Sequence, residues 1–347
     1  PAFSPLGSDL PGQRANLSNG LHNIVKEKKQ AIPIIGKGKQ KTIFLRNSSI
    51  EVLKMAMYEH VFLGTSSAEG LPNPVCNCPA CQAARRLQGK NVRGRSSFKL
   101  SDEVMFDFGP DFVSQAQRYG GDLMRLEHVL ITHTHYDHLS SFALCQYAGS
   151  LVPPEHPVKF YLVGDAYQMA EHTLQDKALY NNGFSAVLEK GRVQFEKLSY
   201  FETYQIGDFS ITPLPGRHPG TFEKTSANYL VERPDHKVLY YGTDTGYYLP
   251  ETVKYLAGRH IDILITECTW GDTWEVNLED KHLSLNTLKP LLEELSAQGT
   301  LDGDSRVYLT HISHNHQRMY DELQQFVGAW KEFPFPIFIA YDGMKIQ

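Results

Sequence analysis

The sequence has no apolar run of about 18 residues or more, the length that a membrane-spanning helix requires. Its first residues also lack the basic and then apolar pattern of a secretory signal. We therefore expect a cytoplasmic protein without membrane contact. No internal repeat and no low-complexity segment occurs. The one plausible domain boundary lies near residues 46–56. The 41% of hydrophobic residues is ordinary for a packed globular core.

Cysteine is scarce, with five in 347 residues. The number is odd, and three of the cysteines, Cys76, Cys78 and Cys81, are bunched in C-N-C-P-A-C. This pattern excludes a disulfide framework and indicates metal binding. Three thiolates are one short of the four ligands that a closed structural zinc site needs, so a fourth ligand must come from elsewhere in the chain.

The net charge of −5 is unevenly distributed. Residues 1–46 contain eight Lys or Arg and two Asp or Glu, which leaves 26 basic against 37 acidic residues in the remainder. We predict a basic N-terminal extension over residues 1–55 and one large domain over residues 56–347. A basic arm can contact phosphate or nucleic acid. The interpretation that we favour is a solvated extension that packs on its own domain or on a partner subunit, for example in a homodimer.

Short β-type runs alternate with helical patterns along the main domain. Strands are predicted at 58–63, 104–108, 129–132, 159–163, 209–214, 238–241, 261–266, 307–310 and 337–341. Helices are predicted at 140–148, 285–295 and 317–330, where apolar residues recur at spacings of three and four. This alternation favours an α/β protein with mixed sheets covered by helices.

The densest motif is T-H-T-H-Y-D-H at residues 132–138, directly after an apolar run. Alternate side chains of an extended segment share a face, so His133 and His135 point the same way. Asp137 and His138 follow where the chain turns, and they can face a second point a few ångströms away. This arrangement suits two cations about 3.5 to 4 Å apart, which can share a hydroxide.

Further candidate ligands stand where other β-runs end. They are His218 in P-G-R-H-P-G, Asp244 in G-T-D-T-G and His311 in L-T-H-I-S-H. Functional groups are commonly placed on loops by a rigid scaffold of strands. Any one of these residues alone is more often structural than a ligand. Their occurrence together with the dense motif predicts a shared metal centre.

These motifs resemble those of the metallo-β-lactamase superfamily, and within it the phosphodiesterases of the carbon-phosphorus lyase pathway, which hydrolyse cyclic ribose phosphates. The resemblance covers residues 62–346 and includes F-L-G-T-S-S-A-E-G-L-P, the cysteine cluster, H-T-H-Y-D-H, H-L-S-L-N-T and Y-D-G-M. It implies a four-layer αββα sandwich with a dinuclear metal centre at the edge of its two sheets. By matching positions, one metal would be held by His133, His135, His218 and Asp244, and the other by Asp137, His138, Asp244 and His311.

The resemblance also assigns residues around the ligands. Asp107 would orient a ligand histidine, and His314 would complete a structural zinc site with the three cysteines, with His316 as a nearby alternative. His282 would lie in the active site without binding metal, where an imidazole suits general-acid catalysis near neutral pH. Glu267 is a weaker candidate for lining the pocket.

The expected activity is hydrolysis of a small phosphodiester by a hydroxide shared between two Mn²⁺ or Zn²⁺ ions, which His and Asp ligands accept. One alternative is a ribonuclease-Z-like nuclease that processes RNA, although the acidic main domain has no evident basic stripe. Another is a non-catalytic binding protein of cofactor biosynthesis from the same superfamily. Because every expected ligand position is filled, catalysis is favoured over the binding protein.

Overall fold

The structure is a computed structural model that describes residues 59–148, 152, 154–168, 191–271, 276–315 and 318–347. The predicted N-terminal extension at residues 1–55 lies outside them, so its extent and role stay predictions. None of the helices in the described ranges combines the length and the apolar character needed to cross a membrane.

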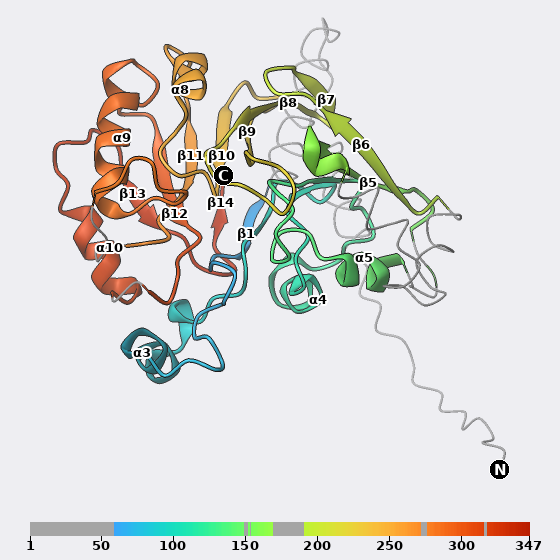
Figure 1. Cartoon of the computed structure of the whole chain (residues 1–347), viewed down its shortest axis with the longest axis horizontal. Coiled ribbons are helices and arrows are strands. Elements are labelled where there is room, and N and C mark those ends of the chain that lie inside the picture. Colours follow the sequence, from blue (N-terminus) through green and yellow to red (C-terminus); the bar gives the residue numbers. More distant parts are fainter. Residues whose placement is uncertain (1–58, 149–151, 153, 169–190, 272–275, 316–317) are drawn as a thin grey trace, which may run out of the picture. The chain divides into compact units, whose positions relative to one another are not determined.

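Two mixed sheets of seven strands each form the body of the main domain (Figure 1). The first sheet has the order β14 (Lys345–Ile346), β1 (His60–Gly64), β2 (Ser97–Lys99), β3 (Val104–Phe106), β4 (His128–Leu130), β5 (Val158–Val163), β6 (Val193–Leu198). The second has the order β13 (Ile337–Ile339), β12 (Arg306–Thr310), β11 (Ile263–Glu267), β10 (Val238–Gly242), β9 (Ala227–Glu232), β8 (Phe209–Pro215), β7 (Tyr204–Ile206). The first sheet is parallel from β3 to β6, and the second is parallel from β10 to β13. The other three pairings of each sheet are antiparallel.

The two sheets pack face to face because their strands alternate between two apolar faces. In β11, Ile263 and Ile265 belong to the core between the sheets, while Leu264 belongs to the core on the outer face. Aromatic rings fill much of the inner layer, and the rings of Phe106 and Tyr241 stack with centroids 4.4 Å apart. Such stacking joins the two sheets into one core.

Helices cover both outer faces (Figure 1). The second sheet packs against α8 (Pro250–Leu256), α9 (Leu285–Ala297) and α10 (Tyr320–Gly328), and the first against α4 (Phe112–Gln115) and α5 (Ser141–Ala148). In α9, the Ser284 hydroxyl caps the first turn by accepting from the Thr287 N–H, and leucines at helical spacing enter the core. The predicted αββα sandwich is therefore confirmed.

All nine predicted strands occur, with ends shifted by up to two residues. The helix predicted at 317–330 begins later than expected, at Tyr320, because Met319 has an extended backbone and forms a capping box with Glu322. It also ends earlier, at Gly328. Among the described residues, the sequence analysis missed strands β2, β6, β7, β9 and β14 and helices α3 (Pro79–Leu87), α4 and α8.

Three candidate site residues stand at strand ends in an unusual backbone conformation. Asp107 after β3, Asp244 after β10 and His311 after β12 have φ values of 61°, 48° and 57°. A left-handed conformation costs a non-glycine residue on the order of 1 kcal/mol or more and persists where the surroundings impose it. Strained backbone of this kind is concentrated at functional sites, so these three turns indicate a functional site at the strand ends.

Candidate metal centres

Three imidazoles converge beyond the ends of β4 and β8. The Nδ1 atom of His135 lies 2.9 Å from His133 Nε2 and 3.2 Å from His218 Nε2. Ligand nitrogens about 2.0 to 2.1 Å from one metal ion are about 2.9 to 3.4 Å apart in octahedral or tetrahedral geometry. We call these three residues the histidine centre, and their spacing fits a single cation.

Next to it lies a second group, Asp137, His138 and His311, which we call the mixed centre. The Nε2 atoms of His138 and His311 both lie 3.0 Å from Asp244 Oδ2, and His138 Nε2 is 3.1 Å from Asp137 Oδ2. His138 Nε2, His311 Nε2 and Asp244 Oδ2 are all buried and make no hydrogen bond within the described residues. Close polar atoms that do not align for hydrogen bonding are expected where a cation binds between them.

Asp244 stands between the two centres. Its Oδ2 faces the mixed centre, and its Oδ1 lies 3.9 Å from His218 Nε2 in the histidine centre. Burial raises the pKa of Asp244, but His311 and His138 outweigh burial and hold that pKa well below its usual range. A buried, ionised carboxylate with one oxygen toward each group fits a ligand shared by two divalent cations. The buried His and Asp clusters therefore indicate a dinuclear metal site.

Asp107 fixes the orientation of His138. Its Oδ2 accepts from His138 Nδ1–H at 2.7 Å, which leaves Nε2 free to face the mixed centre. Its Oδ1 accepts from the Thr132 N–H at 2.8 Å and from the Thr132 hydroxyl at 2.9 Å. The carboxylate is fully buried. It makes the contact that the sequence analysis expected of it, and such partners set the tautomer and orientation of a metal-binding imidazole.

Glu267, at the end of β11, bonds to more parts of the site than the sequence indicated. Its Oε1 accepts from the N–H groups of Thr245 and Gly246, at 2.6 and 3.0 Å, directly after Asp244. Its Oε2 accepts from the Thr269 hydroxyl at 2.5 Å, and that hydroxyl lies 2.8 Å from His311 Nδ1. One buried carboxylate thus positions the loop of Asp244 and the ring of His311. The available signal was an acidic residue that ends a largely apolar strand, ILITE.

His282 lies beside both centres. Its Nδ1 is 2.9 Å from Glu267 Oε2 and 3.6 Å from Asp244 Oδ1. Its ring centroid is 4.5 Å from that of His218 and 5.7 Å from that of His311. Burial lowers the pKa of His282, but the charge of Glu267 and the hydrogen bond to it outweigh burial and raise that pKa above its ordinary value. The structure thus brings His282 into the site, and a protonated ring there is able to donate a proton.

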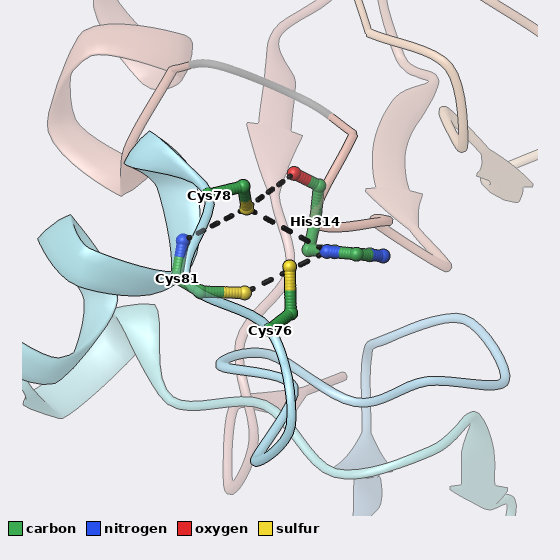
Figure 2. A group of neighbouring side chains, drawn as sticks. All are labelled: Cys76, Cys78, Cys81 and His314. Carbon is green, nitrogen blue, oxygen red and sulfur yellow. Dashed lines mark hydrogen bonds between the residues drawn. The ribbon is translucent and has the colours of Figure 1, made fainter.

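A third group joins the cysteine loop to the segment after β12. Figure 2 shows Cys76, Cys78 and Cys81, at the start of α3, around His314. The sulfur atoms of Cys78 and Cys81 each lie 3.6 Å from His314 Nδ1. This is about the sulfur-to-nitrogen distance in a tetrahedral zinc site with Zn–S near 2.3 Å and Zn–N near 2.0 to 2.1 Å. The alternative ligand His316 lies outside the described residues.

The thiol chemistry of this group also suits a metal. Burial opposes ionisation of Cys78, but the Cys81 N–H and the His314 ring outweigh it and lower the pKa of Cys78 to about 6. Metals bind the thiolate form. The Cys₃His group is therefore a candidate structural metal site.

Gly109 allows the backbone of the Asp107 turn to approach the ligand loop. A Cβ atom at position 109 would lie 2.0 Å from the carbonyl oxygen of Asp137. On either side of this contact, Phe108 N–H donates to the His138 carbonyl at 2.6 Å, and Ser140 N–H donates to the Phe108 carbonyl at 3.0 Å. The turn and the loop are thus joined through backbone bonds that no larger residue at 109 would permit.

A four-layer αββα sandwich with clustered His and Asp residues at the strand ends defines a class of metal-dependent hydrolases. Residues 102–312 match the family model described as "Beta-lactamase superfamily domain", and the chain belongs to that superfamily. No curated protein matches the chain in sequence.

Solved structures share this fold at low sequence identity. A diphosphatase of the PhnP family is 20% identical, with a TM-score of 0.60 over 83% of this chain and 97% of that one. Zn²⁺-bound PqqB from Methylobacterium extorquens is 17% identical, with a TM-score of 0.61 over 83% and 99%. The short form of human tRNase Z is 17% identical, with a TM-score of 0.55 over 83% and 98%. These similarities establish the fold, and they leave the substrate to be argued from the site.

Proposed function

We propose that this protein is a phosphodiesterase that hydrolyses small, including cyclic, phosphodiesters. The observation that supports the proposal is Asp244, whose two oxygens face two separate groups of buried ligands. Two divalent cations bound there, Mn²⁺ or Zn²⁺, would supply an activated water and neutralise negative charge on a phosphate.

The protein's own residues would orient the reaction. His133, His135 and His218 lie on one side of Asp244, and Asp137, His138 and His311 lie on the other. Asp107 and the Thr269–Glu267 pair keep the rings of His138 and His311 turned toward that carboxylate. Since His282 Nδ1–H donates to Glu267, its Nε2 is the atom that would give a proton to the leaving oxygen.

Two further features favour a small substrate over RNA. The chain outside residues 1–46 has 26 basic and 37 acidic residues, so its main domain offers little attraction to a polyanion. A solved relative by fold is named a diphosphatase of the PhnP family, which favours compact phosphorus esters and anhydrides as substrates. A purely binding role would not require the complete set of ligands that is present here.

A substrate screen with metal-loaded protein tests the proposal. The panel contains bis-p-nitrophenyl phosphate, 2',3'-cyclic nucleotides, a dinucleoside diphosphate, a thioester and precursor tRNA. We expect turnover of the phosphodiesters, with a fall of at least about a hundredfold in Asp137→Ala, because that variant removes a carboxylate from the mixed centre. Activity on precursor tRNA alone would replace the proposal with a nuclease. Inactivity on every substrate would favour the binding protein.

His282→Ala tests the proposed proton donor. We expect the variant to slow esters with poor leaving groups, such as a cyclic nucleotide, by about 10² to 10⁴-fold, the usual contribution of a general acid. A p-nitrophenyl ester has a leaving group that needs no proton, so its hydrolysis should change much less. Equal slowing of both substrates would rule out this role for His282.

A further inference from the structure

A buried carboxylate that none of the roles above uses lies beside the histidine centre. Glu223 is 6% exposed. Its Oε1 accepts from the Thr134 N–H at 2.6 Å, and its Oε2 accepts from the Thr134 hydroxyl at 2.6 Å and from the Phe222 N–H at 3.2 Å. A buried charge is stable only when it is well bonded, and here most of the bonding is to one threonine.

That threonine separates two ligands of the histidine centre. Thr134 stands between His133 and His135, and it also bonds the loop that follows His218. The Thr221 N–H donates to the Thr134 hydroxyl at 3.0 Å, and the Thr221 hydroxyl donates to the Thr134 carbonyl at 2.9 Å. Glu223, Thr134 and Thr221 thus fasten the two loops that supply all three imidazoles of this centre.

The histidine centre depends on this link more than the mixed centre does. The second ring nitrogen of His133 reaches the Asp107 carboxylate only through the Thr132 hydroxyl, at 3.1 and 2.9 Å, and that of His218 faces the neutral Lys281 carbonyl at 3.3 Å. In the mixed centre, His138 bonds the Asp107 carboxylate directly, and His311 reaches that of Glu267 through one hydroxyl. Neither His133 nor His218 thus bonds a carboxylate directly through its second ring nitrogen, as His138 does, so the position of their loops matters more to these two rings.

We propose that Glu223 is a positioning residue that holds the histidine centre in its binding geometry through Thr134. Loss of its bonds would allow the two loops to separate and would weaken one metal site of the pair, while the other keeps its own carboxylate supports. The inference rests on the proposed dinuclear centre but not on any substrate, so metal binding tests it whether or not phosphodiesters are hydrolysed.

Glu223→Gln is a nearly isosteric test. In either orientation of the amide, its NH₂ group faces a backbone N–H, that of Thr134 or that of Phe222, so the full set of bonds cannot be restored. We expect cobalt loading to fall from three ions per chain to two, with at least tenfold weaker binding of one ion. Thiolate-to-cobalt charge transfer reports the cysteine site separately, and the total cobalt count less that site gives the occupancy of the dinuclear pair.

Two variants of Thr134 show whether the effect passes through that residue. Thr134→Val should reproduce the loss of one cobalt ion, whereas Thr134→Ser, which keeps the hydroxyl, should retain wild-type loading. The double variant Thr134→Val with Glu223→Gln should lose no more cobalt than either single variant. Asp342→Asn is the matched control, because this half-buried acid also bonds a threonine hydroxyl and a backbone N–H, at 2.7 and 2.6 Å. It should keep all three ions even if its melting temperature falls.

Any of three results would overturn the inference. The first is a Glu223→Gln variant that binds three cobalt ions with wild-type affinity and spectrum. The second is a Glu223→Gln variant that loses both ions of the pair together, and the third is an Asp342→Asn variant that loses the same single ion. The last two results would reflect general destabilisation. If Glu223→Gln does not fold, the comparison of Thr134→Val with Thr134→Ser decides the question by the same cobalt count.

Discussion

Replacing Asp244 by alanine is expected to release both cations of the dinuclear site and to lower hydrolysis by at least about a thousandfold. The two carboxylate oxygens face different groups of ligands, so one substitution removes a ligand from each. Metal ions contribute several kcal/mol to the stabilisation of a charged transition state, which corresponds to a rate factor of that size. Metal analysis of the dialysed variant and its rate with a phosphodiester are the measurements.

The control for this prediction is Asp304→Ala, since Asp304 is an exposed acid in the turn before β12. It should bind as much metal as the wild type and keep its activity. A metal ion bound at the Cys₃His group should remain in both variants. If Asp244→Ala retained two cations in addition to that ion, Asp244 would not be the shared ligand.

Much of this site could be predicted from the sequence because its ligands follow strands in a recognisable way. His133, His135 and His138 are close in the chain, and their spacing alone indicates convergence. Asp244 and His311 each come just after an apolar strand, and β10 and β12 both pair in parallel with β11. Parallel strands end at the same edge of a sheet, so the strand pattern places these distant residues near each other.

The carboxylates behind the ligands could not be predicted in the same way. Glu223 stands alone in the sequence, and for Glu267 the only signal is its place at the end of an apolar-rich strand. Glu223 bonds Thr134, and Glu267 bonds the N–H groups of Thr245 and Gly246 and the ring of His282. These contacts form only when separate segments of the chain fold together. A single acidic residue is usually exposed, so the folded structure is needed to identify both as buried supports.

The missed strands have a related explanation. β6 has the sequence VQFEKL, in which the adjacent charged residues Glu196 and Lys197 interrupt the alternation at the edge of the first sheet, and β2 and β7 have three residues each. Such segments are strands because a neighbour pairs with them, and their own propensity is weak. Most of the predicted strands are apolar runs buried on both faces, but β9, which is also buried, was missed.

Changing Cys78 to serine is expected to abolish metal binding at the Cys₃His group and to lower the melting temperature by about 5 °C or more. Cys76 and Cys78 precede α3, Cys81 lies in its first turn, and His314 comes from the segment after β12, so a metal there joins two distant parts of the chain. Metal binding of this kind adds several kcal/mol to folding stability. Cys268→Ala is the control, because it removes a buried thiol outside the group and should leave the zinc content unchanged. A Cys78→Ser protein with wild-type zinc content and an unchanged melting temperature would show that the group is only a cluster of reduced thiols.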